Sequence, residues 1–167
     1  MSIEDIICLK KFTLLLGDGR SKKQVLAGGH YDGITDTAKK FIASPRFRWA
    51  SSPEEVDLEI FELGYHPSSD QAFEELLARG LEEPTEEDVL RFGEKYPDIQ
   101  LDSPVVFFHK ANLWPKPDGS LNIISLFRPD GERWLACTPF GGSRQLNWNN
   151  QFVGRRPRKK SALASAA

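Results

Sequence analysis

The second half of the chain alternates between apolar runs and short turn signals. Pro-Asp-Gly occurs twice, at residues 117–119 and 129–131, each time between apolar or aromatic segments. Proline presets one backbone dihedral, aspartate bonds the backbone ahead of it and glycine accepts a positive φ, so both tripeptides are typical of tight turns. We therefore predict three antiparallel strands within residues 104–140. The first is expected to be central because it is continuously apolar, and residues 151–153 are expected to form a closing strand.

The N-terminal apolar run, residues 6–16, is ambiguous. It is interrupted by two lysines and fits either a helix or a strand. We favour a helix because Phe12, Leu15 and Leu16 are spaced three and four residues apart. Residues 56–63, in contrast, alternate between apolar and acidic positions, which predicts a half-buried strand.

Polar residues mark the starts of four further helices. Two of them are serines followed by glutamine three residues later, the spacing of a capping box. Threonines are expected to cap the other two, one over residues 36–43 and one that begins with three acids near its positive end. The four predicted caps are Ser21, Thr35, Ser68 and Thr85.

These elements add up to one α+β domain in which short N-terminal helices pack on a C-terminal antiparallel β-meander. The chain has 167 residues, enough for one domain with a real core. We expect residues 1–157 to form this domain and residues 158–167 to be a disordered basic and Ala/Ser-rich tail. The acidic start lacks the layout of a signal peptide, and no apolar stretch is long enough for a membrane span, so a cytoplasmic protein with no membrane contact is expected.

The distribution of charge divides the chain. The net charge is only −2, yet residues 54–102 carry 16 acidic and 3 basic residues, a net charge of −13. The remaining residues carry 19 basic and 8 acidic residues, a net charge of +11. One surface should therefore be strongly acidic, which opposes the approach of nucleic acid phosphates to the middle of the chain.

No catalytic motif stands out. The histidines His30, His66 and His109 have no metal-type spacing, and no serine lies in a Gly-x-Ser-x-Gly elbow. The glycine pairs lack the Lys-Ser/Thr ending of a phosphate loop. The acid run of residues 82–88 is explained as a solvated helix start. We therefore expect no metal and no cofactor, and a protein that is not an enzyme.

Two regions are candidate binding sites. The first is a Trp/Asn-rich loop with a nearby tryptophan, which could stack on and hydrogen-bond a protein or a glycan, although Trp148 could instead fill the core. Its residues are Arg144, Asn147, Trp148, Asn149 and Trp114. The second is the basic tail, which could contact nucleic acid or dock on the acidic segment of the same chain. Its residues are Arg155, Arg156, Arg158, Lys159 and Lys160.

Two resemblances extend this picture. Residues 26–32, Pro84-Thr85, residues 105–114 and Arg133-Trp134-Leu135 resemble a group of uncharacterised small bacterial proteins, over roughly residues 22–155. No activity of that group carries over.

The second half is also similar to the C-type-lectin-like fold, in the branch of formylglycine-generating enzymes and retroelement variable proteins. The matching pieces are Pro84-Thr85-Glu86-Glu87, Gly141-Gly142-Ser143, Asn147-Trp148-Asn149-Asn150 and Gly154-Arg155. This resemblance implies a fold that displays a ligand-binding loop surface. The paired cysteines of formylglycine generation have no counterpart, so it does not imply oxidase chemistry.

The sequence thus favours a non-catalytic ligand- or protein-binding module that uses the Trp/Asn-rich loop. The alternatives are a nucleic-acid-associated accessory protein that uses the basic tail, an enzyme with no visible motif, and a subunit whose acidic face docks on a larger complex.

Overall fold

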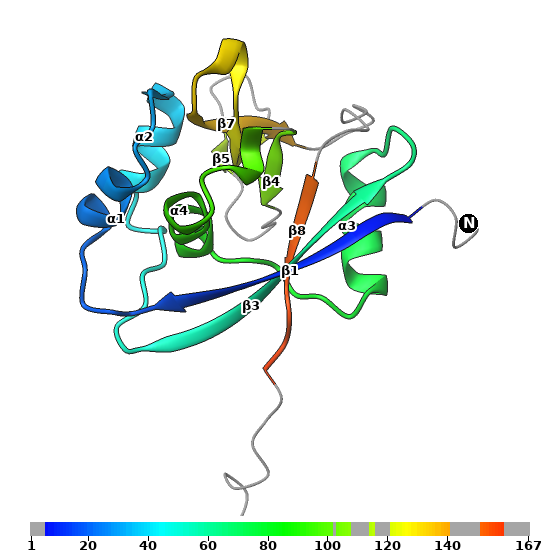
Figure 1. Cartoon of the computed structure of the whole chain (residues 1–167), viewed down its shortest axis with the longest axis horizontal. Helices are drawn as coiled ribbons and strands as arrows, with labels where there is room; N and C mark the ends of the chain where they lie inside the picture. The colour runs from blue at the N-terminus through cyan, green and yellow to red at the C-terminus, as the bar shows by residue number, and fades with distance from the viewer. Residues whose placement is uncertain (1–5, 102, 108–113, 116–120, 141–150, 159–167) are drawn as a thin grey trace, which may run out of the picture.

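The computed structural model describes residues 6–101, 103–107, 114–115, 121–140 and 151–158. These residues form a mixed α+β fold in which four α-helices flank one eight-stranded sheet (Figure 1). The main path of the sheet runs β1-β3-β8-β4-β6-β7-β2, and β5 pairs with β6 beside it. The strands are β1 Ile6–Leu16, β2 Gly33–Ile34, β3 Glu54–Leu63, β4 Val105–Phe107, β5 Trp114–Pro115, β6 Leu121–Phe127, β7 Trp134–Phe140 and β8 Gln151–Arg155.

The N-terminal apolar run is strand β1, so the prediction of a helix there was wrong. β1 pairs antiparallel with β3 along most of its length. Leu14 and Leu16 are buried, whereas Leu15 between them is 53% exposed. This two-residue period is that of a strand with one buried face. The three-and-four spacing of apolar residues was therefore overridden by pairing with a distant segment.

The outer edge of β1 is partly covered by the end of helix α4. The carbonyl of Thr13 accepts hydrogen bonds from Lys95 Nζ at 2.7 Å and from the Tyr96 hydroxyl at 2.9 Å. The carbonyl of Thr13 therefore points away from β3. Lys10 and Lys11 on the same strand are exposed.

The sheet is mixed, which corrects the expected meander. β4, β6 and β7 pair antiparallel as predicted, and the predicted closing strand is β8. However, β8 lies between β3, to which it is antiparallel, and β4, to which it is parallel. β2 also pairs parallel with β7. The N-terminal half thus supplies β1 and β2 to the same sheet, as well as β3, the strand that the alternation of residues 56–63 predicted.

The helices begin where the sequence predicts. They are α1 Lys22–Gly28, α2 Asp36–Ala43, α3 Ser69–Ala78 and α4 Glu86–Lys95. In each case the side chain of the predicted cap accepts a hydrogen bond from the backbone N–H three residues later. The capping box is complete in α1, α3 and α4. None of the described helices has the length and apolar character needed to cross a membrane.

The sheet carries a hydrophobic cluster on each face. Helices α1, α2 and α4 lie on one side and α3 on the other (Figure 1). The larger cluster includes Phe92 and Phe107, and the smaller one includes Phe61, Leu76 and Phe152. Leu77 of α3 is apolar but 53% exposed.

The turn after β1 generates a test of this fold. Gly17 has a φ of +63°, and a Cβ added there would lie 2.0 Å from the Ser52 carbonyl oxygen. Gly19 has a φ of +85°, but an added Cβ would meet no atom within 4 Å. Both substitutions by alanine strain the backbone, and only Gly17→Ala also forces two backbone segments apart.

We expect Gly19→Ala to lower the free energy of unfolding by about 1 kcal/mol, and Gly17→Ala by at least twice as much. Urea denaturation followed by tryptophan fluorescence measures both. Equal losses in the two variants would contradict the close approach of Gly17 to the segment before β3.

Candidate functional site: a charged cleft at the end of the sheet

Three segments far apart in the sequence meet where strand β3 begins and strand β8 ends. The ladder between β3 and β8 reaches Leu58 opposite Arg155, and the next residue, Arg156, donates its backbone N–H to the Asp57 carbonyl at 2.9 Å. Glu82, in the loop after α3, exchanges two backbone hydrogen bonds with Arg155, at 2.7 and 2.8 Å. The start of β3, the end of β8 and this loop are therefore held together by backbone contacts.

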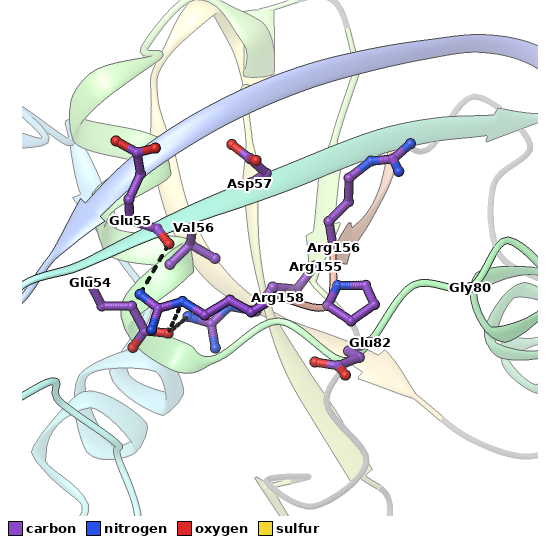
Figure 2. A pocket seen from close by; sticks show the side chains of 10 residues that line it. Glu54, Glu55, Val56, Asp57, Gly80, Glu82, Arg155, Arg156 and Arg158 are labelled. Atoms are coloured by element: carbon purple, nitrogen blue, oxygen red, sulfur yellow. Dashed lines mark hydrogen bonds and ion pairs between the residues drawn. The ribbon is translucent and has the colours of Figure 1, made fainter. Parts of the chain in front are cut away.

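These segments enclose a cleft of about 810 Å³ (Figure 2). Acidic side chains come from β3 and from the loop, and basic side chains come from the end of β8 and the residues after it. The lining residues are Glu54, Glu55, Val56, Asp57, Gly80, Glu82, Arg155, Arg156, Pro157 and Arg158.

Two arginines converge on one carboxylate in this cleft. Glu54 Oε1 lies 3.4 Å from Arg155 Nη2 and 3.6 Å from Arg158 Nε. Arg158 also donates from Nη2 to the Glu55 carbonyl at 3.5 Å. Figure 2 shows Arg155 and Arg158 pointing toward Glu54, while Arg156 points away from them along β3. Arg156 instead pairs with Glu59, which is only 3% exposed although the alternation of β3 predicted an exposed acid there.

The first turn of α4 lies behind the cleft and is fully buried. We predicted a solvated acid run here, but Glu86, Glu87 and Asp88 are at most 1% exposed. Buried carboxylates require partners, and each of these three has its own arginine. Arg48 lies in the loop before β3, Arg91 in α4 itself and Arg155 in β8. Arg48 Nε lies 3.0 Å from Glu86, Arg91 Nη2 lies 3.1 Å from Glu87, and Arg155 Nε lies 3.6 Å from Asp88.

The pair of Glu87 and Arg91 fastens two loops to α4. Glu87 accepts hydrogen bonds from the backbone N–H groups of Ala50, at 2.5 Å, and Gly17, at 3.4 Å. Arg91, only 3% exposed, also donates to Asp18 at 2.8 Å. This hydrogen bond from Arg91 holds the pKa of Asp18 well below its usual range. The turn after β1 and the loop that leads into β3 are thus both fixed to α4 by buried charged groups.

Among the three acids of this turn, Asp88 is the one that contacts Arg155 of the cleft. Its Oδ2 accepts the Thr85 backbone N–H at 2.7 Å, while its Oδ1 is buried and has no hydrogen-bond partner among the described residues. Burial raises the pKa of Asp88 from 3.8 to about 6, against the opposing effects of Arg155 and of the hydrogen bonds from Thr85. The cleft residue Arg155 therefore contacts a buried carboxyl whose pKa is about 6.

The predicted binding residues divide between described and undescribed parts of the chain. Arg155, Arg156 and Arg158 lie in the cleft, where they contact acids of the same chain, which is the intramolecular alternative for the tail. For Trp114, in β5, only the backbone is described, and it pairs with that of Asn122 in β6. The remaining predicted residues, Arg144, Asn147, Trp148, Asn149, Lys159 and Lys160, lie outside the described residues, as does His109.

Sequence reasoning did not single out the acidic half of this site. Glu54 and Glu55 were seen only as part of a segment with a net charge of −13, Asp57 also as a polar position of a predicted strand, and Glu82 also as part of the acid run of residues 82–88. The charge division was the available signal, but it does not specify which acids meet which arginines. Among the residues that the structure describes, no group of three or more histidine, cysteine and acidic side chains could hold a metal ion.

Comparisons of this chain with protein-family models, with curated proteins and with solved structures find no match.

The titration of Asp88 predicts a pH dependence of stability. Its pKa is higher in the folded than in the unfolded chain, so folding takes up a proton and this group makes the protein more stable as the pH falls from about 6 to 3.8. One group changes the free energy of unfolding by about 1.4 kcal/mol per pH unit, so the full effect is on the order of 3 kcal/mol. Asp18, whose pKa is lowered, acts only below this window.

We expect Asp88→Asn, which keeps the cap and removes the charge, to flatten the stability profile between pH 4 and 7. Urea unfolding at each pH measures it, and Asp98→Asn, at an exposed position, is the control. A profile of Asp88→Asn that parallels the wild type would show that Asp88 titrates normally.

Proposed function

We propose that this chain is a non-catalytic module that binds another protein through the charged cleft. The observation that carries the proposal is the cleft of about 810 Å³ with four carboxylates in its lining. Glu55, Asp57 and Glu82 are exposed there. Carboxylates and guanidinium groups recognise charged side chains with directional hydrogen bonds, and a polar rim of this kind is common in transient protein interfaces.

The composition of the cleft favours binding over catalysis. Its ten lining residues include no hydroxyl, thiol or imidazole group, so carboxylates are the only nucleophiles or general bases among them. Arg155 and Arg156 have carboxylate partners less than 4 Å away, which favours structural roles for both.

The other candidate functions receive less support. Binding of nucleic acid by Arg155, Arg156 and Arg158 would bring phosphates against the carboxylates that already pair with these arginines. Binding of a glycan or a protein by the Trp148 loop, and the C-type-lectin-like arrangement of that loop, remain predictions for residues outside the described part of the chain.

A displayed library of random peptides tests the proposal. We expect selected peptides to bind the wild type, and to bind a cleft variant, Glu55→Gln/Asp57→Asn/Glu82→Gln, at least tenfold more weakly. The control variant, Asp70→Asn/Glu74→Gln/Asp98→Asn, has the same change of charge at exposed positions and should bind like the wild type. Fluorescence anisotropy measures the dissociation constants.

Failure of the library to yield any binder, or equal binding by the cleft variant and the wild type, would count against the cleft as a protein-binding site. Thermal unfolding of all three proteins establishes that the variants remain folded.

A further inference from the structure

The net charge of the cleft is negative even when its three arginines are counted. Six carboxylates gather there: four line the cleft, and Glu59 and Asp88 pair with its arginines. The arginines supply three positive charges: Arg155 and Arg158 point toward Glu54, and Arg156 points away from them and pairs with Glu59. Six negative and three positive charges give a net charge of −3 when every carboxyl is ionised. This field attracts a cationic partner and repels a phosphorylated or acidic one.

Arg158 shows how the cleft holds a cation. Its guanidinium reaches both the Glu54 carboxylate, at 3.6 Å, and the Glu55 backbone carbonyl, at 3.5 Å. These distances are at the outer limit of such contacts, and the side chain is 65% exposed. In contrast, Arg91 lies 2.8 Å from Asp18 and is 3% exposed. Exposed, loosely held ion pairs contribute little free energy, so Arg158 is a displaceable occupant.

Arg155 is different, because it lies between an exposed and a buried carboxylate. It reaches Glu54 at 3.4 Å and Asp88 at 3.6 Å. Asp88 has an exposed fraction of 0%, and within the described part of the chain its Oδ1 has no hydrogen-bond partner. If a cation from outside took the position beside Glu54, Arg155 would still be held by Asp88. The cleft can therefore exchange its outer cation without losing its inner one.

We propose that the cleft binds an extended basic segment of a partner protein, with two or more arginine or lysine side chains, and that Arg158 competes for the same place. This proposal rests on the protein-binding function and specifies the chemistry of the partner. The partner's first guanidinium takes the position of Arg158, between Glu54 and the Glu55 carbonyl. Its second cation meets Glu82, for which no ion pair with a described residue is found within 4 Å. The side chains of Glu55 and Asp57 lie on the other side of β3 (Figure 2), where they add to the negative field that attracts the segment.

A fluorescent peptide with the sequence of residues 155–160, Arg-Arg-Pro-Arg-Lys-Lys, serves as the probe. Binding is measured by anisotropy with four full-length proteins: the wild type, the cleft variant Glu55→Gln/Asp57→Asn/Glu82→Gln, the control variant Asp70→Asn/Glu74→Gln/Asp98→Asn, and a tail variant, Arg158→Gln/Lys159→Gln/Lys160→Gln. An acidic peptide in which glutamate replaces each basic residue is the control ligand.

We expect the tail variant to bind the basic peptide about three- to tenfold more tightly than the wild type, because a weak internal competitor has been removed. The cleft variant should bind at least tenfold more weakly than the wild type, and the acidic peptide should not bind. Affinity should fall as salt rises, because exposed charges are screened. If the cleft variant is unstable, Glu82→Gln alone, at an exposed position, should weaken binding about twofold or more.

Equal affinity of the wild type and the tail variant would overturn the competition by Arg158. Equal affinity of the cleft variant and the Asp70→Asn/Glu74→Gln/Asp98→Asn control would overturn the site itself. If the library selects cleft-dependent peptides that are neutral or acidic, the protein-binding function stands and the basic partner is wrong. The two proposals therefore fail in distinguishable ways.

Discussion

The insertion of β8 between β3 and β4 is the constraint on which the described structure depends. On the main path of the sheet, β8 joins the pair β1–β3 to the group β4–β6–β7–β2. Adjacent residues of β8 face opposite sides: Phe152 packs with Phe61 in the cluster beneath α3, and Val153 belongs to the cluster beneath α4. Both cores are thus incomplete until this late segment of the chain has docked, and its parallel pairing with β4 requires a long connection.

The same insertion determines where the basic residues go. Arg155 is the last residue of β8, so the strand's register brings its guanidinium between Glu54 and Asp88. Asp88 in turn belongs to the buried first turn of α4, where each carboxylate has an arginine from a different part of the chain. Removing one member of a buried ion pair costs about 3–5 kcal/mol, because the other charge is left without a partner. Arg155 therefore serves the fold and the cleft together, whereas Arg158, further along, contacts only the cleft.

The parts of this fold that sequence predicted are those specified by neighbouring residues. Helix caps depend on a side chain and a backbone N–H three residues away, and Ser21, Thr35, Ser68 and Thr85 all cap as expected. β1 was mistaken for a helix because its apolar spacing fits both periods, and only its pairing with β3 decides between them. The parallel neighbour of β8 leaves no local trace at all.

The prediction of the candidate site was limited in the same way, because its contacts join residues far apart in the sequence. The separation of charge along the chain was visible, and contact between the basic tail and the acidic segment was one of two interpretations. Which acid meets which arginine depends on the β3–β8 register and on the loop at Glu82, neither of which composition reports. The buried acids of α4 were misplaced because three acids after a threonine cap fit an exposed helix start equally well.

The sealed carbonyl of Thr13 has a consequence for how molecules of this protein behave in a crowded solution. β1 ends the described sheet, and an open strand at such a position is a template on which further chains could stack into fibrils. A second chain that paired with β1 would have to displace the side chains of Lys95 and Tyr96 before its own backbone N–H could reach the Thr13 carbonyl oxygen. It would also approach the exposed side chains of Lys10 and Lys11. At the opposite edge of the described sheet, β2 consists of only two residues, Gly33–Ile34, and so presents little backbone for pairing. Both edges of the described sheet thus carry a feature that opposes the addition of further strands.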